Sequence, residues 1–218
     1  MNFAMKNALI FFALTAGFSH ANATVLVADV PTSNVATTPT FFGGTFLDSA
    51  ITNISNISYN GIARTAVYDT GAGIDFYYQF SNDASSQNGV ARFSGFDFSS
   101  LGAAAVNVFQ TGTGFGIFTN GTEKSEYADR TSAGVIGFNF VPNAESPVNP
   151  GLTSFVQIIR TNARDYKAGN FGLLDGIGDN AKGFAPALTT PVPEPETYAM
   201  LLSGLGFMGF VARRRRYF

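Results

Sequence analysis

Four carboxylates next to aromatic residues are side chains of this sequence that could carry out chemistry: Asp69, Asp75, Asp97 and Asp129. Glycoside hydrolysis uses two carboxyls that flank the scissile bond, so a hydrolase would need two of Asp75, Asp97 and Asp129 to meet. An aspartate at the end of a strand is more commonly a turn former, because its side chain hydrogen-bonds to the backbone that follows. The sequence leaves both interpretations open and identifies no catalytic residue.

A second group of oxygen ligands lies close together in a glycine-rich segment. Asp175, Asp179 and Asn180 supply two carboxylates and an amide, and Ca²⁺ takes six to eight oxygen ligands. Their order does not match an EF-hand loop, and a solvated turn is the alternative. We keep the three residues as calcium candidates and expect no metal or other cofactor.

Four tyrosines could stack against sugar rings or pack inside a sheet: Tyr77, Tyr78, Tyr127 and Tyr166. With the acidic loops, they raise the alternative of a carbohydrate-binding or calcium-dependent adhesion module. Packing in the core is the more ordinary use of such rings.

The pattern between residues 24 and 190 predicts the elements that must position these side chains. Apolar runs alternate with clusters of Gly, Asn, Asp and Ser, as expected of short strands and turns. In the run Ile74–Phe80, the even-numbered residues are apolar and share one face, which puts Asp75 and Gln79 on the other face. The run Phe155–Ile159 is apolar on both faces, so we expect a central strand. The glycine-containing segment Asp69–Gly73 predicts a turn.

We therefore predict one all-β domain, an antiparallel β-sandwich or jelly roll, spanning residues 24–190. A β-solenoid is the competing architecture, but no repeat of fixed period is present. The 218-residue chain is 45% hydrophobic and only 13% charged, with 24 glycines and 23 phenylalanines, which also favours a β protein. This segment carries 8 basic and 13 acidic residues, a net charge of about −5, which argues against binding to nucleic acid.

Residues 1–23 have the pattern of a signal peptide with a helical apolar core. Lys6 precedes the 11-residue apolar run 8–18, and Ala21 and Ala23 give a small-x-small cleavage pattern before Thr24. Signal peptidase is the expected partner. The sequence has no Cys, and its one histidine, His20, would leave with this segment. The mature domain would then contain no thiol and no imidazole group, so it could not use either as a nucleophile, a general base or a metal ligand.

Residues 191–218 combine three features in order. The tetrapeptide Val192, Pro193, Glu194 and Pro195 comes first, the 16-residue uncharged stretch 197–212 follows, and Arg213, Arg214, Arg215 and Arg216 come last. The apolar stretch predicts a single transmembrane helix of marginal length, oriented with its arginines in the cytoplasm. Proline on both sides of Glu194 keeps that site extended.

This combination resembles the PEP-CTERM sorting signal of Gram-negative bacteria, which the membrane enzyme exosortase recognises and cleaves. The resemblance covers about 27 residues. It implies a protein held transiently in the inner membrane and then sorted to the cell envelope, the cell surface or the extracellular space. We expect a non-enzymatic surface or matrix protein associated with biofilm or exopolysaccharide.

Overall fold

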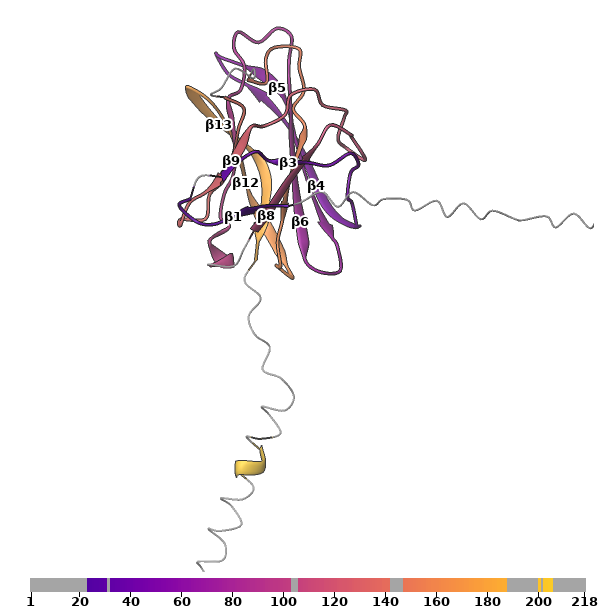
Figure 1. Cartoon of the computed structure of the whole chain (residues 1–218), viewed down its shortest axis with the longest axis vertical. Coiled ribbons are helices and arrows are strands. Elements are labelled where there is room, and N and C mark those ends of the chain that lie inside the picture. The colour runs from indigo at the N-terminus through magenta and orange to yellow at the C-terminus, as the bar shows by residue number, and fades with distance from the viewer. Residues whose placement is uncertain are drawn as a thin grey trace, which may run out of the picture.

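The structure is a computed structural model that describes residues 23–30, 32–102, 106–141, 147–187, 200 and 202–205. Its strands form two sheets, A and B (Figure 1). Sheet A contains β1 (Thr24–Leu26), β3 (Ala36–Thr37), β4 (Thr45–Ser55), β5 (Asn60–Asp69), β6 (Ile74–Asn82), β8 (Val106–Thr111) and β11 (Val156–Arg160). Sheet B contains β2 (Thr32–Ser33), β7 (Arg92–Gly95), β9 (Tyr127–Arg130), β10 (Ile136–Asn139), β12 (Tyr166–Asp175) and β13 (Ile177–Pro186).

The all-β prediction is confirmed. Sheet A has the order β1-β8-β11-β6-β5-β4, and sheet B has the order β13-β12-β7-β10-β9-β2. Neighbours in both orders are antiparallel, while β3 adds a parallel pairing at Ala36↔Phe109 and Thr37↔Gln110. Strand β11 lies between β8 and β6, so the expectation of a central strand for this run is also confirmed.

The inner faces of the two sheets form the main core. Phe76, Tyr78 and Phe80 on β6 are fully or almost fully buried, as their alternation predicts. The Tyr78 ring lies 5.1 Å from the ring of Phe171 on β12, which joins sheet A to sheet B. Burying one such ring contributes about 2–3 kcal/mol, so this aromatic face is a large part of what holds the sheets together.

The turn between β5 and β6 forms where the sequence predicts it. The Asp69 carboxylate accepts a hydrogen bond from the Gly71 amide at 2.7 Å, and the Thr70 amide donates to the Gly73 carbonyl at 2.9 Å. Gly71 adopts φ +78°, a left-handed conformation that glycine reaches without strain. Asp69 therefore acts as a turn former.

The outer face of sheet A is covered along β6, whereas one face of many antiparallel sheets is exposed to solvent. Asp75, Tyr77 and Gln79 point away from the main core on β6, yet all three are fully buried. A second cluster covers this face, built from Ala66, Tyr68, Tyr77, Phe109, Phe118, Val156 and Ile158, with Ala23, Ala36, Phe41 and Ile117 packed against it. Strand β3 with the loop that follows it to Phe41, and the loop residues Ile117 and Phe118, thus supply the cover.

Candidate functional site

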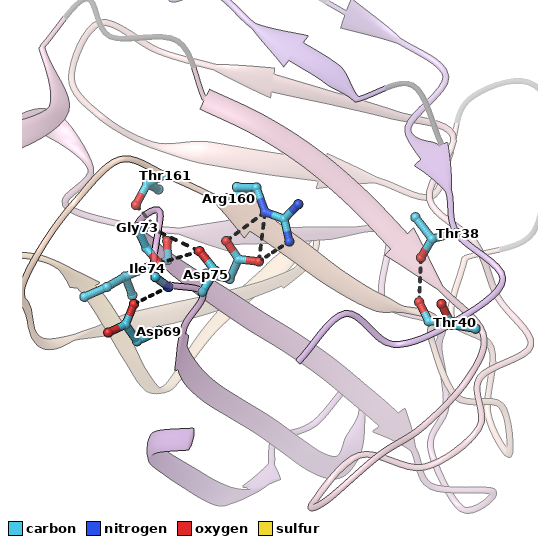
Figure 2. Close-up of polar contacts among 10 residues, drawn as sticks. Thr38, Thr40, Asp69, Gly73, Ile74, Asp75, Arg160 and Thr161 are labelled. Carbon is cyan, nitrogen blue, oxygen red and sulfur yellow. Dashed lines mark hydrogen bonds and ion pairs between the residues drawn. The ribbon is translucent and has the colours of Figure 1, made fainter. Parts of the chain in front are cut away.

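The centre of the candidate site is an ion pair on the outer face of sheet A (Figure 2). Asp75 on β6 and Arg160 on β11 are register partners on adjacent strands. Arg160 Nη2 donates to Asp75 Oδ2 at 2.7 Å, and Nε donates to Oδ1 and Oδ2 at 3.1 and 3.0 Å. Such a two-point pairing fixes the carboxylate in one orientation.

Aromatic rings enclose this pair. The Arg160 guanidinium carbon lies 4.5 Å from the centroid of the Phe42 ring and 5.3 Å from that of Phe109. Phe41, the residue before Phe42, stacks on Tyr77 at 4.7 Å between ring centroids. The charge of Arg160 therefore has a cation–π partner in the covering loop as well as its carboxylate partner.

Backbone and side-chain hydrogen bonds fasten the two covering loops. The Thr38 amide donates to the Gln110 carbonyl at 2.8 Å, and the Thr38 hydroxyl donates to the Thr40 carbonyl at 2.9 Å (Figure 2). Buried Gln79 donates to the Thr119 carbonyl at 2.6 Å and accepts from the Thr119 amide at 3.0 Å. The polar residues of this outer face thus position loops over it.

Burial has the largest effect on the pKa values of Asp75 and Tyr77. It raises the pKa of Asp75 above its ordinary value, although hydrogen bonds and charge from Arg160 act in the opposite direction. Burial also raises the pKa of Tyr77, and the nearby negative charge of Asp75 adds to that effect. The Tyr77 hydroxyl lies near enough to Asp75 to influence its pKa, but within the described part of the chain it completes no well-formed hydrogen bond.

A second arginine–aspartate pair lies on the outer face of sheet B. Arg92 on β7 binds both carboxylate oxygens of Asp129 on β9, at 2.5 and 2.8 Å. Asn139 on β10 donates to Asp129 Oδ2 at 2.8 Å and accepts from Arg92 Nη1 at 2.7 Å. Arg92 crosses the intervening strand at Gly137, where an added Cβ would collide with the guanidinium. Glycine at 137 is what lets this pair form.

The sequence-predicted acids are kept apart. Asp75 pairs with Arg160 on sheet A, Asp129 with Arg92 on sheet B, and Asp97 with Lys167 at 2.5 Å on the surface. Each carboxylate of this trio therefore has its own cation, and the three lie in separate ion pairs.

The three calcium candidates lie in the hairpin β12–β13. Asp175 Oδ2 accepts from the Ser58 hydroxyl at 2.7 Å, and Asp179 Oδ2 accepts from Asn56 Nδ2 at 3.4 Å. Asp179 Oδ1 accepts from the Asn180 amide at 2.8 Å. In the described ranges, no group of three or more His, Cys, Asp or Glu side chains could hold a metal ion. These side chains tie the hairpin to the β4–β5 turn.

Two of the four tyrosines pack inside the domain, which was the alternative to a sugar-binding platform. Tyr77 and Tyr78 are buried on opposite faces of β6, because adjacent residues of a strand point in opposite directions. Tyr127 and Tyr166 are partly buried, and Tyr166 packs on Phe184.

Phenylalanines form the exposed aromatic surface instead. Phe46 and Phe115 are 54% and 61% exposed, and Phe42 is also exposed and packs on the Phe109 ring of the outer-face cluster. Phe46 contacts the Tyr68 ring and Phe115 contacts the Phe41 ring, at 5.7 and 5.4 Å between centroids. We call Phe42, Phe46 and Phe115 the aromatic rim. Sequence reasoning missed the rim, since nothing in a Phe-rich sequence marks which phenylalanines stay outside.

The predicted processing residues lie largely outside the described residues. This holds for Ala21 and for Val192, Pro193, Glu194, Pro195 and Arg213–Arg216. Ala23 packs at the outer-face cluster, and Thr24 begins β1, with its hydroxyl donating to the Asn34 carbonyl at 3.0 Å.

The predicted signal helix falls in the undescribed residues 1–22. Of the predicted transmembrane stretch 197–212, the structure describes residues 200 and 202–205, which are helical. The search of the described residues finds no helix that is long and apolar enough to cross a membrane.

Comparison with known proteins identifies one segment of the chain. Residues 191–216 match the PEP-CTERM protein-sorting motif. Neither the curated proteins nor the solved structures contain a match to the chain. The match covers the tetrapeptide, the apolar stretch and the four arginines in the order that the sequence shows. This chain therefore carries a PEP-CTERM sorting motif, which implies export to the cell envelope or surface with exosortase as the processing partner.

Proposed function

We propose that this protein is a non-enzymatic component of the cell surface or extracellular matrix, cleaved by exosortase and associated with exopolysaccharide or biofilm. The observation that carries the proposal is the PEP-CTERM motif at residues 191–216. The β domain adds support, because the aspartates that could form a hydrolytic pair are bound to separate cations.

Intact mass of the protein from the cell envelope and the medium tests the sorting step. In cells with active exosortase, we expect a species that begins at Thr24 and ends near Pro193–Pro195. Cells without the enzyme should lack this species. A protein that keeps Arg213–Arg216 in both strains would contradict the proposal.

Two glutamates provide a matched pair of variants for the same experiment. Glu194 lies between the two prolines of the motif, whereas Glu196 lies just beyond Pro195. We expect Glu194→Gln to reduce processing and Glu196→Gln to leave most of it, because both variants remove one negative charge but only the first alters the Pro-Glu-Pro element. Equal processing of both variants would show that exosortase does not recognise the Glu194 side chain.

The aromatic rim favours a second candidate function, a carbohydrate-binding module. Exposed aromatic rings can stack on sugar rings, and the rim is held in place by Tyr68 and Phe41 beneath it. The acidic net charge of the domain favours neutral glycans over anionic polymers.

A glycan array of neutral polysaccharides, with and without a calcium chelator, tests this candidate. We expect binding that Phe46→Ser and Phe115→Ser weaken, and that Ile57→Ser does not, since Ile57 is exposed on the β4–β5 turn away from the rim rings. Binding abolished by the chelator would support the calcium-dependent adhesion alternative. Absence of binding in both conditions would remove this candidate.

A further inference from the structure

The two sheets end in five edge strands of very different length. Strands β1, β2 and β3 have 3, 2 and 2 residues, whereas β4 and β13 have 11 and 10. An edge strand presents unpaired N–H and C=O groups, so a long one is a template for pairing with another strand. Only β4 and β13 are long enough to offer such a template in the described sheets.

Strand β13 is protected in the ways that natural proteins use for edges. It carries Asp179, Lys182 and Pro186. The Lys182 amide also donates to the Thr52 hydroxyl at 3.2 Å, and the Lys182 carbonyl accepts from the Thr65 hydroxyl at 3.0 Å. Charges, proline and contacts with sheet A therefore discourage pairing along β13.

Strand β4 lacks the lysine and the proline of β13, and it contacts β13 through the side chain of Thr52. Its sequence, TFLDSAITNIS, contains no lysine, arginine or proline, and Asp48 is its single charge. Phe46, Leu47 and Ile51 are exposed, with Ile51 at 59%. A bulge between Phe46 and Asp48 interrupts the pairing with β5, so the regular part of the edge starts at Asp48. From Asp48 onward the edge is regular and nearly uncharged, and it exposes Ile51.

We propose that β4 pairs with β4 of a second copy of this chain, antiparallel and centred on Ala50. In that register, Asp48 lies opposite Thr52 and Ser49 lies opposite Ile51, so the two copies of Asp48 do not face each other. The two Ile51 side chains become diagonal neighbours on the outer face, within reach of contact. Such a pairing is isologous, with the same residues contributed by both copies, and it joins sheet A of one copy to sheet A of the other.

A second copy fits this edge better than an unrelated strand because the pattern is self-complementary. The single charge meets a hydroxyl, and the exposed isoleucine meets a small serine beside its symmetry mate. The paired segment is short, from Asp48 to Thr52, so the dimer is expected to be weak and to depend on concentration.

Sedimentation velocity of the full chain in mild detergent, over a wide concentration range, tests the proposal. We expect a monomer–dimer equilibrium that Ile51→Lys weakens about tenfold or more, because the two introduced charges become neighbours. Ile57→Lys is the matched control, since Ile57 is 80% exposed but lies on the turn after β4. Association through any other segment would be common to all three proteins.

Hydrogen exchange locates the contact independently. Amides within residues 48–52 should gain protection at high protein concentration in the original chain and lose that gain in Ile51→Lys. Circular dichroism establishes that the variant remains folded. A monomer at every concentration, equal weakening by Ile57→Lys, or dimerisation without protection of β4 would each overturn the proposal.

Discussion

The outer faces of the two sheets each carry an arginine–aspartate pair, and the two pairs differ in what covers them. Asp75 is fully buried beneath the aromatic cluster and Arg160 is one-third exposed, whereas Arg92 and Asp129 both keep 24% of their side-chain surface. Among the residues that the structure describes, Arg160 is the one cation paired with Asp75, whereas Asp129 pairs with Arg92 and also accepts a hydrogen bond from Asn139.

The pKa values of the two aspartates are consequently shifted in opposite directions, although each aspartate is paired with an arginine. Burial raises the pKa of Asp75, and Arg160 does not fully offset it. Burial acts on Asp129 too, but hydrogen bonds from Arg92 and Asn139 outweigh it and lower the pKa. The comparison teaches that an arginine partner alone does not set the direction of an aspartate's pKa shift: burial under the aromatic cluster prevails at Asp75, and the additional hydrogen bond from Asn139 helps Arg92 to prevail at Asp129.

Removing Arg160 should have the largest effect. Arg160→Leu leaves the buried Asp75 carboxyl without its cation, so that it must either stay charged or take up a proton, and we expect a loss of about 3–5 kcal/mol in the free energy of unfolding at neutral pH. Urea unfolding measures this. The double variant Asp75→Asn/Arg160→Leu should recover much of the loss. Arg164→Leu is the control, since exposed Arg164 only donates to the Gly71 carbonyl. Equal effects at 160 and 164 would refute the role of burial.

Disturbing the Arg92–Asp129 pair on sheet B should lower the free energy of unfolding less than removing Arg160 does. Gly137→Ala places a methyl group where the Arg92 guanidinium lies, and we expect a loss of about 1–2 kcal/mol as the hydrogen bonds to Asp129 are displaced. In an Arg92→Ala background, the same substitution should cost little. A double-mutant cycle measured by urea unfolding tests this coupling. Additive losses would mean that Gly137 is needed for another reason.

The pH dependence of stability should separate the two pairs by sign. The lowered pKa of Asp129 gives stability that is present above the unfolded value near 3.8 and is lost as pH falls through the native pKa. The raised pKa of Asp75 has the opposite effect, so its contribution declines as pH rises from 3.8 through the native pKa.

Unfolding free energies of Asp129→Asn and Asp75→Asn, measured against the original chain from acid to neutral pH, test these signs. The loss caused by Asp129→Asn should grow with pH, and the loss caused by Asp75→Asn should shrink. Parallel pH profiles would show that the two carboxylates are not in different environments.

The smallest effect is expected at the surface pair. Asp97 and Lys167 are each about half exposed, and Lys167 lowers the pKa of Asp97 chiefly through a hydrogen bond. Asp97→Asn should change stability by less than about 0.5 kcal/mol, and about 1 M salt should abolish the difference. If Asp97→Asn lost as much stability as Gly137→Ala, solvent exposure would not explain the order in which the ion pairs contribute to stability. Thermal unfolding at low and high salt measures this.

The alternation in Ile74–Phe80 was enough to predict the strand and its inner face, and the glycine-containing segment Asp69–Gly73 was enough to predict the turn before it. The alternation was not enough to predict that Asp75 and Gln79 are buried. Period-two patterning tells which residues share a face, but a face becomes buried only when distant segments, here the loops with Phe41 and Thr119, fold over it.

The candidate site shows the same limit. Asp75 was identifiable as a carboxylate beside aromatic residues, but its partner Arg160 lies 85 positions away in the sequence. The aromatic rim could not be recognised, because exposed and buried phenylalanines look alike in a sequence that contains 23 of them.

The sequence by itself determined the all-β fold and the sorting motif at 191–216, because strand alternation and a linear signal are both written in neighbouring residues. Only the tertiary structure decided which aspartate meets which arginine, which phenylalanines stay outside and which strand edge stays open. Those properties depend on contacts between segments far apart in the chain, and local residue order does not encode such distances.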